Sequence, residues 1–355
     1  MRETAGQYQF WNKKNQFKYL KDLFTERYNT EKEAECFNML KEDLIMKKII
    51  SVILCAVMLI MSGAALADYP EKTIQLTVPF AAGGGTDAVA RALANAAEKY
   101  LGQSVVIVNT TGGSGAVGLT DGAGKAPDGY NLTMITRELV TLPINGLCPV
   151  TVDNFELICN VNLDPGMVTV AANSPIQSLQ ELLDEARKTP GALKFASTAT
   201  PNMYAYTVEL DQDIIFNHIP FNGAAEAIPE VLGGHADFTI TSPGEAISQV
   251  LGGQMRALAV MSEERLEALP DVPTFKELGI DIVTGTWRGI AAPKNTPADV
   301  VAKLRDAFAK AVQDEDFVSF MKNASLNIYY LDAESYAKFI AEDTETASAI
   351  FSAIQ

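Results

Sequence analysis

Three consecutive glycines, Gly83, Gly84 and Gly85, stand before Thr86 and Asp87 in the stretch PFAAGGGTDAVARALA (79–94). The apolar run before them is typical of a strand, and the pattern after them is typical of a helix. A glycine-rich turn at a helix start exposes backbone N–H groups beside the positive end of the helix dipole, which suits a carboxylate or a phosphate. The stretch matches neither the nucleotide P-loop nor the dinucleotide motif GxGxxG. The residues leave open the alternative of a simple turn with Thr86 or Asp87 as the helix cap.

Other small or polar segments follow predicted strands in the same way. TTGGSGAVG (110–118) opens a helix of small residues, for which we favour close packing of the helix on a sheet. STATPN (197–202) gathers hydroxyl and amide groups without charge. PFNGAAEA (220–227) places Asn222-Gly223 at a turn before a helix. The last two segments are further candidates for a binding site.

Residue sets typical of catalysis or metal binding are missing from the sequence. It has two histidines, and we expect His218 to be a hydrogen-bonded structural residue and His235 to be exposed. Neither the nucleophile elbow Gly-x-Ser-x-Gly nor the zinc motif HExxH occurs. We therefore predict no catalytic residues, no metal site and no cofactor. Positive charge is available from Arg137, Arg256 and Arg288, and for Arg288 we favour a structural ion pair.

Residues 46–67, MKKIISVILCAVMLIMSGAALA, indicate an export signal. Two lysines, an apolar run and an A-x-A site follow one another as in a secretory signal peptide, and cleavage would leave Asp68 as the first residue. A membrane anchor is the alternative, but the run is short for a span of roughly 20 apolar residues. Because a signal peptide normally begins its chain, residues 1–45 are predicted to be a non-native extension from a start codon assigned too early. Export predicts a periplasmic protein.

Cys148 and Cys159 remain after such a cleavage, as an even pair in an exported protein. An oxidising compartment permits a disulfide between them. We favour the bridge over two reduced, buried thiols, since Cys148 lies in a proline-flanked loop and Cys159 in the strand pattern that follows.

Composition excludes some classes of protein. The chain has 355 residues, 48% of them hydrophobic, which is enough for two ordinary domains with sizeable cores. Its net charge of −16 argues against a nucleic acid partner. Strand-like runs alternate with helix-like runs, which indicates an α/β fold with largely parallel sheets. The predicted strands are 74–80, 104–109, 130–136, 167–172, 193–197, 213–219, 236–241, 256–261 and 288–293, and the predicted helices are 87–100, 178–188, 225–232, 297–312 and 332–351.

From Tyr69 onward the chain resembles the extracytoplasmic solute receptors of the tripartite tricarboxylate transporter family, the Bug-type or TctC-type binding proteins. The segments that carry the resemblance are YPEKTIQLTVPFAAGGGTD (69–87), LGQSVVIVNTTGGSGAVG (101–118), APDGYNL (126–132), PFNGAAEAIPEVLGGHADF (220–238), MRALAVMSEERLEALPDVPTFKELG (255–279) and TWRGIAAPKNTP (286–297). The resemblance implies a two-domain, periplasmic-binding-protein-like (type II) Venus flytrap with mostly parallel sheets and an interdomain cleft. The implied domains are 68–168 plus 290–355 and 169–289, with MVTVAA and RGIAAP as the crossing strands.

The resemblance also implies which residues hold the ligand. Family members typically bind a carboxylate through backbone amides and ordered waters at the first strand–helix loop, and here Asp87 would orient that loop. The opposing domain would contribute the loops STATPN and PFNGAA. The implied ligand-binding residues are Ala81, Ala82, Gly83, Gly84, Gly85, Thr86, Asp87, Thr136, Ser197, Thr198, Asn202, Phe221, Asn222 and Ala224.

Two departures from the family pattern concern the far end of the ligand. The usual loop Ser-Thr-Gly-x-Gly is replaced by one with Ala199 and Thr200-Pro201. The usual aromatic-Lys-Gly is replaced by Phe221-Asn222-Gly223, so that a positive side chain is lost. These changes fit a ligand with one carboxylate and a polar or neutral far end.

The function implied by the resemblance is that of a monomeric receptor for a small organic carboxylate. The receptor would deliver its ligand to the integral-membrane permease subunits of a tripartite carboxylate transporter. The first alternative is a sensor of the same fold that reports the ligand to a signalling partner. The second is an exported enzyme that acts on a carboxylate.

Overall fold

The computed structural model describes residues 69–354 and, before them, residues 18–21, 23, 25, 32 and 46–48. The predicted extension 1–45 and signal peptide 46–67 therefore lie almost wholly outside the described residues. By its internal contacts the chain divides into Met1–Asp68 and Tyr69–Gln355, and every described strand belongs to the second unit. Among the described residues, no helix is long and apolar enough to span a membrane.

The first sheet contains the strands that begin and end the second unit. Its spatial order is β11 (Ile328–Asp332), β4 (Phe155–Pro165), β10 (Gly285–Pro293), β3 (Asn131–Thr136), β1 (Ile74–Val78) and β2 (Val105–Asn109). One face is covered by α2 (Gly85–Leu101), α9 (Ala298–Ala311) and α10 (Glu315–Asn323). The other face is covered by α3 (Ala116–Ala123), α4 (Glu138–Ile144) and α11 (Ala333–Ile354). Apolar side chains of these helices, such as Leu93, Leu304 and Leu139, are buried against the sheet, and their removal from water stabilises the fold.

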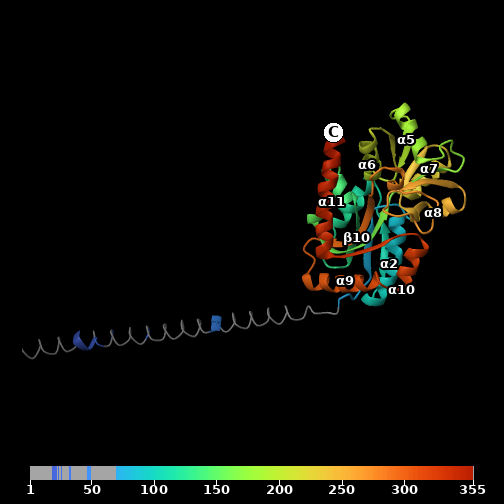
Figure 1. The fold of residues 1–355 in the computed structure, drawn as a ribbon. Coiled ribbons are helices and arrows are strands. Elements are labelled where there is room, and N and C mark those ends of the chain that lie inside the picture. The colour runs from blue at the N-terminus through green and yellow to red at the C-terminus, as the bar shows by residue number, and fades with distance from the viewer. Residues whose placement is uncertain are drawn as a thin grey trace, which may run out of the picture. The chain divides into compact units, whose positions relative to one another are not determined.

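The second sheet is built from the middle of the chain. Its spatial order is β7 (Asn217–Pro220), β6 (Lys194–Ser197), β8 (Phe238–Thr241), β5 (Met167–Ala171) and β9 (Met255–Val260). Its faces are covered by α5 (Leu179–Lys188) with α6 (Met203–Gln212), and by α7 (Ala224–Leu232) with α8 (Pro243–Leu251). The start of α5 shows one half of the predicted capping box, since the Ser178 hydroxyl accepts a hydrogen bond from the Glu181 amide at 3.2 Å. The Glu181 carboxylate accepts from the Gln177 amide at 2.7 Å, one residue before the expected Ser178 amide. Figure 1 shows α5 to α8 grouped away from α9 and α10.

Both sheets are mixed, so the expectation of mostly parallel sheets is wrong. β1 runs parallel to β2 and β3, and β6 runs parallel to β7 and β8. β10 runs antiparallel to β3 and β4, β11 to β4, and β5 to β8 and β9. The physical reason is the crossing between sheets. β10 arrives from the second sheet and enters the first at the edge where β1 and β3 end, so it runs antiparallel to β3. In the same way, β5 arrives from the first sheet at the edge where β6 and β8 end, and it runs antiparallel to β8.

The chain crosses between the sheets at two places that touch. β4 continues through Gly166 directly into β5, so the predicted crossing strand MVTVAA lies wholly in the second sheet. The return runs from Met261 to Thr284 and enters β10, where the predicted crossing strand RGIAAP lies in the first sheet. The Met261 amide donates to the Gly166 carbonyl at 2.8 Å, Gly166 donates to Thr284 at 3.2 Å, and Thr284 donates to Met261 at 3.1 Å. The predicted domain boundaries stay a prediction.

Cys148 and Cys159 are both free and buried, so the predicted disulfide is wrong. Cys159 lies in β4 and packs into the core beneath α2 and α9, whereas Cys148 belongs to the core on the opposite face of the sheet. The first sheet thus separates the two thiols. Burial raises the pKa of the Cys159 thiol to about 12.

Two glycines let α3 lie close to the first sheet. A Cβ at Gly118 would stand 2.6 Å from the Pro79 Cα, and one at Gly122 would stand 2.1 Å from the Thr133 hydroxyl. Contacts this short are incompatible with a side chain unless the helix moves. This supports the packing interpretation of the second glycine cluster.

We expect Gly122→Val to lower the free energy of unfolding by about 1–3 kcal/mol, because the added side chain overpacks the contact between α3 and β3. Urea denaturation measures the change. Gly124→Ala is the matched control at the end of the same helix, since its Cβ would lie at an ordinary 3.4 Å from the Thr120 carbonyl. Equal effects of the two substitutions would contradict the close packing of α3.

Candidate functional site

A cavity of about 60 Å³ lies at the ends of strands from both sheets. A single water molecule needs roughly 10–15 Å³ by this measure, so the cavity has room for roughly four to six waters or a ligand of similar size. Each of β1, β3, β6, β7 and β8 leads into a helix whose start lines the cavity. The lining residues at these starts are Gly84, Gly85 and Thr86 of α2, Arg137 and Glu138 of α4, Asn202 and Met203 of α6, Gly223 and Ala224 of α7, and Ser242 and Glu245 of α8.

The convergence of helix starts makes the cavity electropositive without free cationic side chains. The first amides of a helix have no partner within it, and the dipole places about half a positive charge there. Among residues 69–354, the amides of Thr86, Met203 and Ala224 donate to no acceptor. These amides are therefore available to water or to an anion.

The predicted binding residues come together around this cavity. Those that line it are Ala81, Gly84, Gly85, Thr86, Thr136, Thr198, Asn202 and Ala224. The remaining predicted residues lie in the same loops but outside the lining, and they are Ala82, Gly83, Asp87, Ser197, Phe221 and Asn222. Binding by any of them stays a prediction.

Asp87 holds the glycine loop in shape from behind. Its carboxylate accepts hydrogen bonds from the Gly83 amide at 2.9 Å, from the Asn109 side chain at 3.0 Å and from Arg91 at 2.9 Å. Burial opposes its charge, but these hydrogen bonds outweigh burial and hold the pKa of Asp87 below its usual value. This is the orienting role expected of Asp87.

Asn222 and Ser197 hold the loops of the second sheet. The Asn222 carbonyl accepts from the Ala81 amide at 3.2 Å and so joins the two sides of the cavity. The Ser197 carbonyl accepts from the Phe221 amide at 2.9 Å, and its hydroxyl donates to the Ala199 carbonyl. These bonds fix loop shape and leave neither side chain in the cavity wall.

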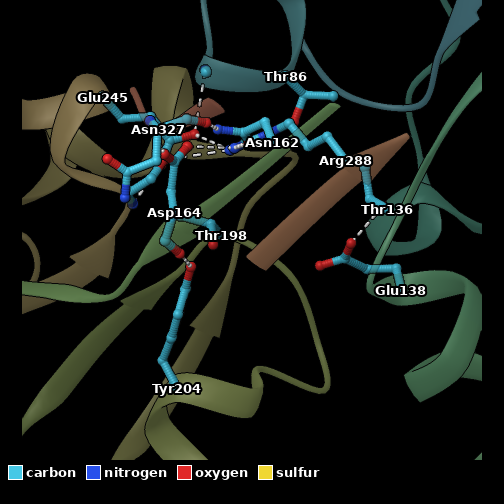
Figure 2. A network of polar contacts seen from close by, with 12 residues as sticks. Thr86, Thr136, Glu138, Asn162, Asp164, Thr198, Tyr204, Glu245, Arg288 and Asn327 are labelled. Carbon is cyan, nitrogen blue, oxygen red and sulfur yellow. Dashed lines mark hydrogen bonds and ion pairs between the residues drawn. The ribbon is translucent and has the colours of Figure 1, made fainter. Parts of the chain in front are cut away.

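Arg288 is the centre of a buried network that joins both sheets (Figure 2). Its guanidinium donates to Asn162 at 2.6 Å and Asp164 at 2.7 Å in β4. It also donates to the Thr86 hydroxyl at 3.0 Å and to the Ser242 hydroxyl at 3.3 Å. Burial disfavours its charge, but the carboxylates of Asp164 and nearby acids hold its pKa above the usual value. As predicted, Arg288 forms a structural ion pair.

Arg137, the other basic residue of the lining, is engaged as well. It forms a bidentate pair with Asp343 of α11 at 2.6 and 3.1 Å, and it donates to Thr284 at 2.9 Å. The same Asp343 accepts from the Trp287 indole at 2.9 Å. Arg256 lies outside the lining, where it donates to the carbonyls of Ala172 and Ile176. The guanidinium groups of all three arginines thus form hydrogen bonds with other residues of the protein.

Two glutamates line the cavity and differ in how well they are bonded. Glu245 accepts from the Gly85 amide at 3.2 Å and from the Ser242 amide at 2.8 Å, and lies 3.6 Å from Arg288. Glu138 accepts from the Thr136 hydroxyl at 2.5 Å. Burial raises the pKa of Glu138 above its usual value, although the Thr136 hydroxyl and the two arginines favour its charged form.

Sequence reasoning did not select these glutamates, although signals for them exist. Ser242-Pro243-Gly244-Glu245 follows an apolar run and has the spacing of a capping box, which marks a helix start like the others. Glu138 comes two residues after the predicted Thr136, and Thr141 follows it at helical spacing.

His218 lies outside the lining, and its ring contacts Glu209 at 3.0 Å, as expected of a structural histidine. Within the described part of the chain, no group of three or more His, Cys, Asp and Glu side chains is placed to hold a metal ion.

A profile of the tripartite tricarboxylate transporter family receptor, TctC, matches residues 89–355. The chain belongs to this family. Its relatives include the UPF0065 protein in the gbd 5′ region of Cupriavidus necator, which is 34% identical over 300 residues, or 82% of this chain and 90% of that protein. BugT of Bordetella pertussis is 30% identical over 287 residues, or 78% of this chain and 87% of that protein.

Solved structures confirm the Venus flytrap fold. A TctC solute-binding protein from Polaromonas, without ligand, is 36% identical with a TM-score of 0.60 and covers 80% of this chain and 99% of its own. The periplasmic binding protein BugD is 28% identical with a TM-score of 0.75, over 80% of this chain and 98% of its own. MatC from Rhodopseudomonas palustris, with bound malate, is 25% identical with a TM-score of 0.72, over 79% of this chain and 99% of its own.

We expect Glu138→Gln to stabilise the ligand-free protein at neutral pH. A carboxyl whose pKa is raised by folding costs no stability below the ordinary value of 4.5, and the cost appears as the pH rises through its folded pKa. Thermal unfolding at pH 4 and at pH 7.5 measures the difference between variant and wild type. The variant should gain stability at pH 7.5 and little at pH 4, and a gain of the same size at both values would contradict the shift.

Proposed function

We propose that the protein is an extracytoplasmic solute-binding receptor for a small organic carboxylate. In this proposal it binds the ligand between domains 68–168 plus 290–355 and 169–289, and acts as a monomer. It then delivers the ligand to the integral-membrane permease subunits of a tripartite-type transporter. Ligand binding shifts an equilibrium between open and closed forms, and the permease recognises the closed form.

The observation that carries the proposal is the meeting of helix starts around one small cavity. The unpaired amides of Thr86 and Ala224 come from opposite sheets and line the same space. A carboxylate between them receives donors from both sides, and hydrogen bonds to a charged group are worth roughly 1.5–3 kcal/mol each. The ligand thereby favours closure, since only the closed form presents both sets of donors.

Membership of the family supports the transport role. The family is that of receptors for a tripartite tricarboxylate transporter, and the similar protein MatC was solved with bound malate. The signal peptide predicted at residues 46–67 supports a periplasmic location. A sensor of the same fold remains the second candidate, because the same cavity serves a receptor that reports its ligand to a signalling partner.

Thermal unfolding of the purified protein with a panel of small carboxylic acids tests the proposal. A ligand at 100 times its dissociation constant should add roughly 2.7 kcal/mol of stability. We expect a carboxylate to raise the melting temperature and its matched amide and alcohol to leave it unchanged. The panel is repeated after unfolding and refolding, which removes any ligand retained from the host. No shift with any acid after refolding would overturn the carboxylate receptor, and turnover of a bound acid would favour an enzyme.

Gly84→Asp should weaken binding of the best acid from that panel by roughly 10- to 100-fold, because a like charge replaces favourable donors near the carboxylate. The fold should tolerate the change, since a Cβ at Gly84 lies at an ordinary 3.5 Å from the Ala81 carbonyl. Gly84→Ala is the matched control, which adds the Cβ without the charge and should bind nearly as the wild type does. Calorimetry measures both variants. Unchanged affinity of a folded Gly84→Asp would remove this loop from the site.

A further inference from the structure

The basic side chains of the cavity wall are already paired with carboxylates of the protein. Among the lining residues the cations are Arg137 and Arg288. Arg137 is held by the Asp343 carboxylate, and Arg288 by Asp164 with Asn162, Thr86 and Ser242. Anion binding therefore depends on the unpaired helix-start amides of α2, α6 and α7.

The wall at the start of α4 has the opposite character. Glu138 receives a hydrogen bond from Thr136, and no basic residue of the described chain forms an ion pair with it. Figure 2 shows one carboxyl oxygen bonded to Thr136 and the other turned away from it. Thr141 lies one turn further along α4, lines the same cavity, is 2% exposed, and its hydroxyl has no hydrogen-bond partner among the described residues. The cavity wall here thus carries the Glu138 carboxylate, bonded to Thr136 and to its own backbone amide, and the unpartnered Thr141 hydroxyl.

Glu245 does not share this property. Both of its oxygens accept backbone amides, and Arg288 lies beside it. The unpaired negative charge of the cavity is thus concentrated at Glu138, whereas the unpaired amides are those of Thr86, Met203 and Ala224. A ligand that contacts both kinds of group has two different ends.

We propose that the cavity selects a carboxylate that also carries an ammonium group, and that Glu138, with Thr141, binds the ammonium. This inference rests on the proposed carboxylate receptor and adds a substrate class to it. A second carboxylate at this end would meet Glu138 without any free cation to offset the repulsion. An ammonium instead forms a charge-assisted hydrogen bond with Glu138. The raised pKa of Glu138 agrees, since burial disfavours its charge more than Thr136 and the two arginines stabilise it, and a bound cation would favour the charged form.

Calorimetry with four matched C4 acids tests the assignment: butyrate, 2-aminobutyrate, 4-aminobutyrate and succinate. The protein is produced from the full-length chain and refolded to remove retained ligand. We expect at least one amino acid to bind wild type about 10-fold or more tightly than both butyrate and succinate. In Glu138→Gln this preference should fall to within about threefold. Glu315→Gln is the matched control, because Glu315 is an exposed acid in the first turn of α10, and it should keep the preference.

Each outcome decides one of the two proposals. Butyrate or succinate binding wild type as tightly as both amino acids would overturn the ammonium assignment and leave the carboxylate receptor standing. A preference that survives in Glu138→Gln would also overturn the role of Glu138. If Glu138→Gln does not fold, Thr141→Val decides in its place, and it should reduce the preference. Binding of none of these acids, nor of any acid in the thermal panel, is instead a failure of the carboxylate receptor itself.

Discussion

A buried positive charge organises the rest of this structure. The Arg288 side chain is 2% exposed, and a charge at such a depth is tolerated only when it is paired and hydrogen-bonded. Its partners come from β4 of the first sheet, from the start of α2 and from the start of α8 in the second sheet. The hydrogen bonds of the Arg288 guanidinium therefore fix the starts of α2 and α8 relative to the central strand β4. The cavity is the space that remains in front of this network.

The same constraint decides what kind of chemistry the cavity offers. Because its arginines are paired with Asp164 and Asp343, the donors that the wall offers to an anion are neutral amides on several helix starts. A net charge of −16 does not oppose this, since surface charge is screened over about 8 Å at physiological salt while the amides act at contact distance. Hydrogen bonding by backbone amides requires the backbone to be held in position. Side chains near the cavity, such as Asp87 and Ser197, form hydrogen bonds with the backbone of the surrounding loops and so hold it.

Local patterns in the sequence predicted the glycine loop before α2, the capped start of α5 and most strands of both sheets. The list of predicted strands omits β4 and β11, although a strand pattern was noted at Cys159. The patterns also gave no direction to β10, because strand pairing depends on which distant segment lies alongside. The disulfide failed for the same reason, since sequence spacing cannot tell which face of a sheet a cysteine occupies. Although Phe80 and Gly223 of the same loops were missed, eight residues of the cavity lining were predicted. Glu138 and Glu245 were not, because their importance arises only when helix starts from two sheets meet.

The two separated thiols leave residues 69–354 without a disulfide that folding would have to form. Oxidative pairing and reshuffling take seconds to hours in proteins that need them, and this described part of the chain needs no such step. Cys159, with its high pKa, stays protonated at neutral pH and so lacks the thiolate that reacts with oxidants and other thiols. Residues 69–354 should therefore fold alike in a reducing cytoplasm and in an oxidising envelope.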